Sequence, residues 1–454
     1  MSTTLSVGPV RTDQRLPAAR SERHHLAAST VVVATALTVL NRIRMQRHLV
    51  DLQVYRKGAW AFLHGRNLYG PGLPGPKLPY TYTPFSTVAF APLELLPQHA
   101  AMIAHTFVSL ALLYVGIALV LRELEGRGSW TPTILALAAA ATFAAYWSEP
   151  VSQTLGFGQI NLVLMGMVLI DLLALRNSRW CGVLIGIAAG IKLTPLVFVA
   201  YLLLTKRRRA AAVAAIAAAG TVVVGWVLMP GPSNRYFFHL VFDDRRIGAP
   251  GFVANQSLNG MWTRLMHGYV PARHIWDLSA IVVLTVGLWT ARRVHARLGE
   301  PHGLAITAVT GLLVSPISWS HHWVWFVVPA LILASAAWRA RSIALGVVAV
   351  AWSLPFYLGP FWHIAHRNYR AIAPVGWQRP LADAYTLTAL VALVAIVIWD
   401  QAAGRRGLIR DESLPAASGV ADIGRRVGSH RSLMPSRASS ERPQAARGVR
   451  HDHH

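Results

Sequence analysis

Residues 210–229, AAAVAAIAAAGTVVVGWVLM, form an apolar run that directly follows the basic cluster Lys206-Arg207-Arg208-Arg209. None of these 20 residues is charged. An α-helix of about 20 apolar residues spans the hydrocarbon core of a bilayer, so the run predicts a transmembrane helix. The cluster before it predicts the cytoplasmic end, because Lys and Arg accumulate on that side of a membrane.

Similar apolar runs recur on both sides of this one, along most of the chain. Of the 454 residues, 54% are hydrophobic and 14% are charged, and the mean hydropathy is +0.41. Soluble domains of this size do not have such a composition. We expect an all-α, polytopic integral membrane protein with about 10–13 transmembrane or re-entrant helices joined by external loops.

The net charge of +24 is carried mainly by the two ends of the chain and by short connections between apolar runs. No basic stripe is interleaved with stacking aromatic residues, so we expect no nucleic-acid partner. The single cysteine, Cys181, excludes an intrachain disulfide and a cysteine-based metal cluster. Neighbouring histidines such as His321 and His322 point about 100° apart on a helix and make poor joint ligands. We expect no metal and no other cofactor.

Polar segments flank the apolar part of the chain. Residues 1–23 are basic and poor in large apolar side chains, and they predict a disordered cytoplasmic leader. Residues 401–454 are rich in Arg, Ser, Gly and Pro and predict a disordered, basic cytoplasmic tail. Residues 24–400 between them form the expected transmembrane domain.

The apolar run 182–204 is interrupted by Gly190-Ile191-Lys192-Leu193-Thr194-Pro195 and has basic residues at both ends. Proline removes a helix hydrogen bond, so we expect two half-helices that enter from the cytoplasm and return, with Lys192 near the apex. A lysine in mid-span costs about 2.5–3.5 kcal/mol. A bound anion would offset that cost, and snorkelling of the ammonium group to the nearer interface is the alternative.

Residues 41–97 are too polar for a span and too aromatic for a disordered linker, so we expect a structured external loop. Its segment 83–97 either spans the membrane or re-enters it. Asp51 begins an amphipathic helical segment that includes Tyr55. A carboxylate at such a position either caps the helix or acts in catalysis, and the sequence alone leaves both open.

Further polar islands occur at the external ends of apolar runs, so the topology gathers them on one face. Lone amides there also serve as helix caps or as contacts between helices. Sugars are bound by amides and aromatic rings, whereas a phosphate needs cations. The expected sugar or acceptor contacts are Tyr55, Tyr82, Gln159, Asn161, Asn255, Gln256 and Trp319. The expected contacts with a donor phosphate are Lys192, His321, His322 and Arg264. These features suggest glycosyl transfer from a lipid phosphate.

Seven short motifs in order resemble one known family. The motifs are Asp51-x3-Tyr55, Gly65-x-Asn67-Leu68-Tyr69, Tyr82-Thr83-Pro84, Gly158-Gln159-Ile160-Asn161, Ile191-Lys192-Leu193-Thr194-Pro195, Asn255-Gln256-Ser257 and Ser315-Pro316-Ile317-Ser318-Trp319-x-His321-His322. The chain, from about 50 to 399, resembles the actinobacterial polyprenol-phosphate-mannose-dependent α-1,2-mannosyltransferases, a PimE-like group of the GT-C superfamily. One departure is Thr83-Pro84, where the family often has two prolines.

The resemblance implies that residues 24–400 are a GT-C transmembrane catalytic domain. It implies a polyprenyl-phosphate mannose donor, a mannosylated glycolipid or polysaccharide acceptor such as lipomannan, and inversion to an α-1,2 linkage. The active site would lie on the external, periplasmic face of the plasma membrane, among membrane lipid, with both tails cytoplasmic. The family's essential acid falls on Asp51, which would take the proton of the acceptor 2-hydroxyl.

Other functions remain open from the sequence. Within the enzymes, the nearest is transfer of arabinofuranose from decaprenyl phosphate. A flippase or transporter of lipid-linked sugars would use the same broken helix, but it predicts internal repeats, which this sequence lacks. If Asp51 is only a cap, the base must be sought among the other acids of the external segments. These are Glu94, Glu149, Asp243, Asp244 and Asp277.

Overall fold

The structure, a computed structural model, describes residues 16–44, 49–126, 129–364 and 374–412. The chain divides into two units, Met1–Asp400 and Gln401–His454. Of the second unit, only the residues that continue the last helix are described. The described part of the chain is helical, with one isolated bridge between Asn255 and Trp319 and no strand. The all-α class is therefore confirmed.

Six described segments are long and apolar enough to cross a membrane. They lie in α1 (Leu16–Arg44), α4 (Gln98–Leu124), α10 (Arg208–Leu228), α13 (Tyr269–Leu298), the continuous segment of η6 (Ser320–Phe326) and α15 (Val327–Ala340), and α18 (Ala384–Glu412). A seventh crossing exists if α5 (Pro132–Tyr146) and α6 (Glu149–Phe157), bent by 76°, form one broken span. The protein is therefore a polytopic membrane protein.

The other apolar runs form helices that are shorter than the roughly 20 residues of a full crossing. Among them are α7 (Asn161–Leu169) with the π-helix η2 (Ile170–Ala174), α8 (Val183–Ile191), η3 (Thr194–Leu196) with α9 (Val197–Leu204), α14 (Glu300–Val314) and α16 (Ile343–Leu358). The segment 83–97 contains the 11-residue helix α3 (Pro84–Glu94), whose length of about 16 Å is too short to cross a bilayer.

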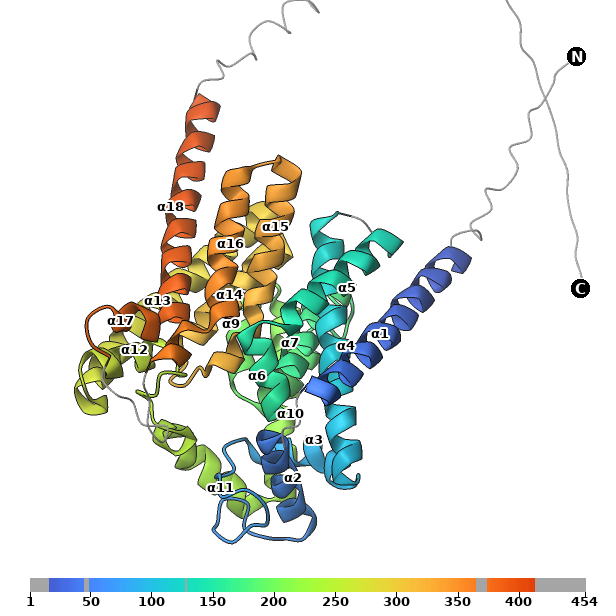
Figure 1. The fold of residues 1–454 in the computed structure, drawn as a ribbon, viewed down its shortest axis with the longest axis vertical. Coiled ribbons are helices and arrows are strands. Elements are labelled where there is room, and N and C mark those ends of the chain that lie inside the picture. The colour runs from blue at the N-terminus through green and yellow to red at the C-terminus, as the bar shows by residue number, and fades with distance from the viewer. Residues whose placement is uncertain (1–15, 45–48, 127–128, 365–373, 413–454) are drawn as a thin grey trace, which may run out of the picture. The chain divides into compact units, whose positions relative to one another are not determined.

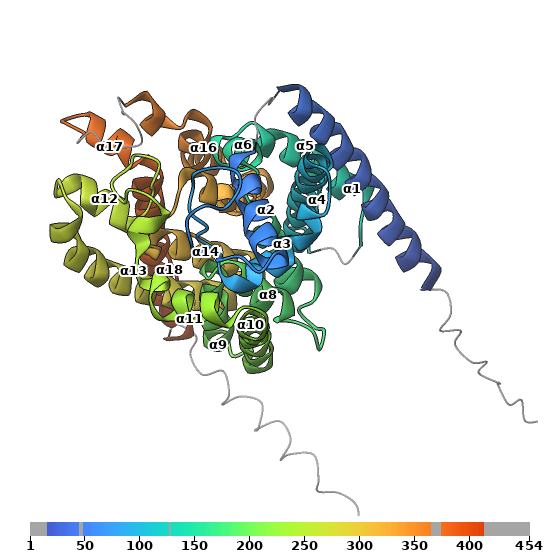
Figure 2. The ribbon, with the colours of Figure 1, turned by 90° about the horizontal axis from the view of Figure 1, so that it is seen from below.

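The remaining elements cover one end of the helix bundle (Figure 1). They are α2 (Val50–Leu63), α11 (Pro230–Phe238), η4 (Leu240–Phe242), η5 (Asp244–Ile247), α12 (Leu258–Leu265), η7 (Pro360–His363) and α17 (Gln378–Ala382). Seen from this end, α2 and α3 lie near the middle of the face (Figure 2). The turn between α15 and α16 lies at the opposite end of the bundle.

Ion pairs join the helix ends that carry the basic clusters. The pairs are Arg207–Glu300, Arg297–Asp400, Arg339–Glu125 and Arg176–Glu123. They link the start of α10 to the start of α14, the end of α13 to α18, and the end of α15 to the end of α4. These basic helix ends therefore gather at one end of the bundle.

A glycine stripe packs α8 against α10 and reveals the path of the chain. A Cβ on Gly182 would lie 2.2 Å from the carbonyl oxygen of Ala210, and one on Gly190 would lie 2.2 Å from Oγ1 of Thr221. The two helices therefore run parallel and touch where only glycine fits. Because α9 ends just before α10 begins, α9 must run back toward the start of α8. The segments α8 and α9 thus form a hairpin.

Lys192 lies at the apex of this hairpin. It ends α8 in an extended conformation, and Thr194 and Pro195 then begin the short 3-10 helix. The nine residues of α8 rise about 13 Å, roughly half of the hydrocarbon core. The break that the proline predicted is present, and it leaves Lys192 on the side of the bundle away from the basic clusters.

The ends of the chain differ from the expected boundaries where they are described. Helix α1 begins at Leu16, inside the predicted leader 1–23, and residues 1–15 lie outside the described part. Helix α18 continues to Glu412, past the predicted boundary at 400, and residues 413–454 lie outside the described part. A helix that crosses a membrane often continues into the adjoining polar segment, because its backbone hydrogen bonds are local.

Candidate active site

Asp51 lies in the first turn of α2 and does not cap it. The capping position is Leu49, whose φ of 44° and ψ of 64° are left-handed and whose side chain makes no capping hydrogen bond. Such a conformation is strained for a leucine and persists only where tertiary contacts hold it. Leu49 is buried against the rest of the molecule. The capping interpretation of Asp51 is therefore wrong.

Gly158 is the residue that allows α2 to dock. Its φ is +71°, and a Cβ there would lie 2.8 Å from Cβ of Leu52 and 2.9 Å from Cβ of Leu49. Any other residue would be strained in this left-handed conformation and would clash with α2. Gly158 ends α6, and the next residue, Gln159, is thereby placed beside Asp51.

Gln159 is the hydrogen-bond partner of Asp51. Its Nε2 donates to Oδ2 of Asp51 at 2.8 Å. Its Oε1 accepts from the hydroxyl groups of Tyr55 at 2.8 Å and Tyr82 at 3.1 Å. The other carboxylate oxygen, Oδ1 of Asp51, accepts no hydrogen bond from any residue that the structure describes. One oxygen of the acid is thus held and the other remains available.

Burial changes the acidity of Asp51. Desolvation raises the pKa of its carboxyl group to about 6, and the Gln159 hydrogen bond and the charge of Lys192 oppose that rise. A base with a pKa near 6 is ionised at neutral pH and still has appreciable proton affinity. Asp51 is therefore suited to accept a proton from a hydroxyl group.

Lys192 faces the same region from the hairpin apex. Its Nζ donates to Oδ1 of Asn161 at 3.2 Å and to Nε2 of His322 at 3.0 Å, and it lies 5.8 Å from the ring centre of Tyr82. An ammonium group has three protons, so one remains after these two hydrogen bonds. Within the described residues, the Lys192 side chain has no ion-pair partner closer than 4 Å.

The segment that contains His321 and His322 is held by hydrogen bonds from α6 and α7. Thr154 Oγ1 and Asn161 Nδ2 donate to the backbone carbonyl of His321 at 2.8 and 2.9 Å. The rings of His321 and His322 lie 4.9 Å apart. The Nε2 atom of His321 is buried without a hydrogen-bond partner among the described residues. A buried, unpaired nitrogen is uncommon in native proteins and is a feature of sites that bind a ligand.

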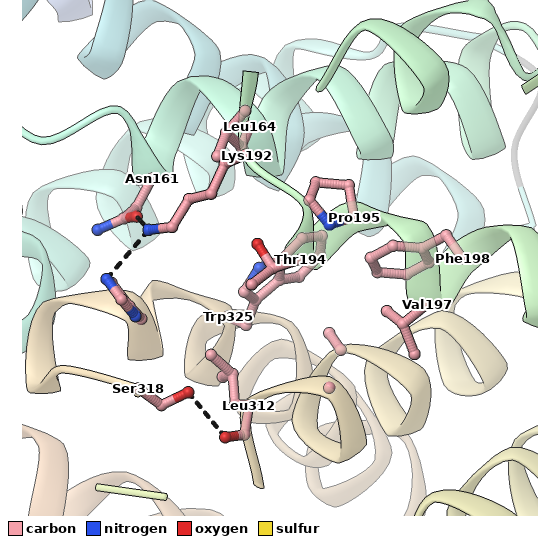
Figure 3. Close-up of a pocket in the computed structure, with 13 residues that line it drawn as sticks. Asn161, Leu164, Lys192, Thr194, Pro195, Val197, Phe198, Leu312, Ser318 and Trp325 are labelled. Atoms are coloured by element: carbon pink, nitrogen blue, oxygen red, sulfur yellow. Dashed lines mark hydrogen bonds between the residues drawn. The ribbon is translucent and has the colours of Figure 1, made fainter. Parts of the chain in front are cut away.

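A cavity of about 50 Å³ adjoins Lys192 and has room for several water molecules (Figure 3). Its polar end is formed by Lys192, Asn161 and His322, which come from three different elements. The other walls are mainly apolar side chains, including Phe198, Leu312 and Trp325, with Thr194 and Ser318 as polar exceptions. The cavity therefore combines a cationic end with hydrocarbon-like walls.

Asn255 and Gln256 lie elsewhere and do not face this cavity. Both side chains are fully buried. Nδ2 of Asn255 donates to the carbonyl groups of Pro250 and Pro316, and Nε2 of Gln256 donates to those of Val253 and Ala382. These amides hold loops together, and the structure does not bring them to Asp51 or Lys192.

Arg264 and Trp319 belong to the same loop region. Arg264 is buried, forms an ion pair with Asp383, and donates to the carbonyl groups of Phe252 and Asn255. Trp319 packs against Phe252, with ring centres 6.1 Å apart. Asp383 thus supplies the counter-charge that a buried guanidinium needs, and the structure does not bring Arg264 to the cavity beside Lys192. Trp319 serves packing at this position.

The other acids considered as bases are paired. Glu149 accepts hydrogen bonds from Ser320, Trp362 and Tyr385. The remaining pairs are Glu94 with Arg56, Asp243 with Arg245, and Asp244 and Asp277 with Arg273. Asp51 differs from the four arginine-paired acids because it forms no ion pair within the described residues, and from Glu149 because one of its oxygens accepts no hydrogen bond there.

Two residues at the site were not found from the sequence: Thr154, which holds the His321 carbonyl, and Trp325, which lines the cavity. Single Thr and Trp residues give no distinguishing signal. Ser318 also lines the cavity; it belongs to one of the seven motifs but was assigned no role. Within the described residues, no three His, Cys, Asp or Glu side chains are close enough to hold a metal ion together.

Comparison with known proteins identifies the family. The sequence model of glycosyltransferase family 87 matches residues 80–316. A curated relative from Mycobacterium tuberculosis (strain ATCC 25618 / H37Rv) is 36% identical over 76% of this chain and 83% of its own length. A relative from Mycolicibacterium smegmatis (strain ATCC 700084 / mc(2)155) is 33% identical over the same shares of the two chains. Both are named polyprenol-phosphate-mannose-dependent alpha-(1-2)-phosphatidylinositol mannoside mannosyltransferase.

A second kind of relative is also similar. A Mycolicibacterium smegmatis phosphatidylinositol pentamannoside mannosyltransferase is 35% identical over 63% of this chain and 73% of its own length. No solved structure matches the chain, so the GT-C fold stays a prediction. The family model matches more than half of the sequence. The two phosphatidylinositol mannoside mannosyltransferases are each at least 33% identical to this chain over 76% of its length. The chain therefore belongs to glycosyltransferase family 87.

Proposed function

We propose that this glycosyltransferase moves mannose from polyprenyl-phosphate mannose to the 2-hydroxyl of a mannoside, in an α-1,2 linkage. The names of its relatives support this donor and linkage. They also support an acceptor of the phosphatidylinositol mannoside class. The observation that carries the proposal is that Asp51, which has one unpaired oxygen, lies within the electrostatic influence of Lys192, which has one unused proton.

The proposed reaction is a single displacement. The acceptor oxygen forms a bond to C1 of mannose while the bond between C1 and the phosphate oxygen breaks. Asp51 takes the proton of the acceptor hydroxyl, a role worth about 10² to 10⁴ in rate. Polyprenyl phosphate leaves with the bonding electron pair from the opposite side of C1, so the configuration inverts.

The leaving phosphate gains negative charge and needs donors and cations rather than a proton. Lys192 supplies a charge and a free N–H, and His321 supplies a buried nitrogen that has no partner in the described structure. His322 accepts from Lys192 and therefore orients the ammonium group. The polyprenyl chain would continue along the apolar walls that include Pro195, Phe198 and Leu312.

We place the site on the external face of the plasma membrane. The supporting observation is the gathering of basic helix ends at the end of the bundle away from Lys192. Such ends face the cytoplasm in most membrane proteins. A lipid-linked sugar donor suits this side, where nucleotide sugars are absent and the energy for transfer must come with the lipid.

The decisive assay uses purified protein in detergent with radiolabelled polyprenyl-phosphate mannose and a phosphatidylinositol mannoside. We expect release of polyprenyl phosphate together with a new α-1,2-mannoside. We expect the rate to remain the same when a metal chelator is added. Decaprenyl-phosphate arabinose serves as the competing donor in a parallel reaction. Preferred use of arabinose would overturn the donor assignment. With the protein reconstituted into vesicles, movement of the donor lipid across the bilayer without cleavage would overturn glycosyl transfer.

A further inference from the structure

Gln159 connects two parts of the site that the reaction scheme does not explain. It was expected to bind sugar, yet its amide group is occupied on both sides. Nε2 faces Oδ2 of Asp51, and Oε1 faces the hydroxyl groups of Tyr55 and Tyr82. The side chain is only 6% exposed, which leaves little surface for a sugar.

The direction of this hydrogen-bond chain is set by the backbone. The N–H of Ile160, which can only donate, points to the hydroxyl oxygen of Tyr55 at 3.2 Å. Tyr55 therefore directs its own proton away from Ile160, and Oε1 of Gln159 accepts it at 2.8 Å. With Oε1 facing the phenols, Nε2 must face Asp51. Every group in the chain thus donates toward the carboxylate.

The frame that holds this chain is rigid. Tyr55 is fully buried and stacks on Phe90 with ring centres 4.3 Å apart. The backbone carbonyl of Gln159 accepts from Nε2 of His105 at 3.3 Å. Gly158, in its left-handed conformation, fixes the turn just before Gln159. Rotation of the amide would break contacts on both of its sides.

We propose that Gln159 is a positioning residue that holds Asp51 by Oδ2 and presents Oδ1 to the acceptor hydroxyl, with Tyr55 and the Ile160 N–H setting its direction. This inference rests on the proposed role of Asp51 as the base. It replaces the expectation that Gln159 binds sugar. A carboxylate held through one oxygen keeps the other at a fixed distance from the reacting proton, which is the geometry that a general base requires.

The pH profile separates positioning from a structural role. The hydrogen bond from Gln159 stabilises ionised Asp51 and so lowers the pKa of Asp51 against the effect of burial. Removing this bond should raise that pKa, and the acid limb of kcat/KM should move to higher pH. The titratable groups that face Asp51 from neighbouring elements are Tyr55, Tyr82, Lys192 and, through Lys192, His322.

The test compares Gln159→Met with wild type across pH 4.5 to 9, by measuring kcat and the two KM values. We expect the acid limb of kcat/KM to move to higher pH by about one unit. A hydrogen bond to a charged group contributes at least about 1.5 kcal/mol, and one pKa unit corresponds to about 1.4 kcal/mol. We expect kcat to fall about ten- to hundredfold through lost orientation, with the donor KM unchanged. Tyr55→Phe keeps the ring on Phe90 and should move the limb in the same direction by less.

Gln256→Leu is the matched control, because Gln256 is also a fully buried amide but its side chain bonds only to backbone groups, including those of Ala382 and Tyr385. It should lower the thermal stability and leave the acid limb in place. An unmoved limb in both Gln159→Met and Tyr55→Phe would overturn the positioning role. A raised acceptor KM with an unmoved limb would instead assign Gln159 to sugar binding. A normal rate in Asp51→Asn would show that the base itself is wrong, which is a separate failure.

Discussion

The site around Asp51 and the loop region around Gln256 are built from the same residue types but use them differently. The loop region, which we call the loop clamp, consists of Asn255, Gln256, Arg264 and Asp383. In the clamp, all four side chains are buried. Arg264 and Asp383 form an ion pair, and Arg264 and Gln256 also donate to backbone carbonyl groups. At the site, Oδ1 of Asp51 and one proton of Lys192 remain unused.

This difference identifies function better than residue type does. A buried polar group that is fully paired contributes to the shape of the fold, since its hydrogen bonds are already made. A polar group with an unused donor or acceptor beside a cavity retains the capacity to bind a substrate. The comparison therefore supports the proposed roles of Asp51 and Lys192 in the reaction, whereas Gln256 and Arg264 have all their partners within the fold.

The largest expected effect is that of Asp51→Asn on the rate of transfer. An amide cannot take a proton, so the rate should fall by about 10² to 10⁴. Because burial raises the pKa of Asp51, ionisation opposes folding above about pH 6, and the neutral variant should be at least as stable as wild type at pH 8. Transfer assays and thermal unfolding at pH 8 check both parts.

A near-normal rate in Asp51→Asn would show that Asp51 is not the general base. The site around Asp51 would then resemble the loop clamp, where the polar side chains only support the fold. The other acids would then have to be tested in turn, beginning with Glu149, which is buried among three donors. Asp51→Glu is a useful companion, because it keeps the carboxylate but displaces it from Gln159.

Arg264→Met should have the next largest effect, and it should act on stability. The change leaves Asp383 buried without its counter-charge, which typically costs about 3–5 kcal/mol. Asp383→Asn in the same chain should restore part of the loss. Two measurements distinguish a role in the fold from a role at the site. They are the midpoint of thermal unfolding, which should fall, and the transfer rate per folded molecule, which should not change. A specific increase in the donor KM, with stability unchanged, would place Arg264 at the phosphate after all.

Lys192→Met should weaken donor binding with a smaller effect on folding. Removal of a charge-assisted hydrogen bond is worth about 1.5–3 kcal/mol, or roughly ten- to hundredfold in the donor KM. The acceptor KM should remain unchanged. Lys192→Arg keeps the charge but replaces the ammonium with a planar guanidinium, whose donors have a different geometry toward Asn161 and His322, and it should recover only part of the affinity. Equal donor KM values in all three proteins would show that Lys192 only supports the hairpin.

The smallest effect on activity is expected from two cysteine substitutions that test which end of the bundle faces outward. Val375 and Trp338 are 64% and 85% exposed and lie near α17 and at the end of α15. In a Cys181→Ala background, Val375→Cys should react with an impermeant maleimide in intact cells. Trp338→Cys should react only after lysis. The reverse pattern would put the site in the cytoplasm and exclude the proposed external transfer.

The sequence by itself determined the membrane class and the path of the hairpin. The apolar runs exclude water as the main solvent, and these constraints are local, so they can be read without knowing any tertiary contact. Pro195 and Lys192 together predicted a break in a short apolar run, and the structure has that break. Asp51 stood out for a similar reason, as an acid at the start of an amphipathic helix.

Only the tertiary structure decided which amide contacts Asp51 and which cation lines the cavity. Gln159 and Gln256 both stand in polar islands at the ends of apolar runs, and nothing in their neighbours distinguishes them. Asp51 is 108 residues away from Gln159 in the sequence, and Ala382 is 126 residues away from Gln256. A hydrogen bond forms with whatever the packing of helices brings within about 3 Å. The role of each side chain therefore depends on a partner that its own stretch of sequence does not contain.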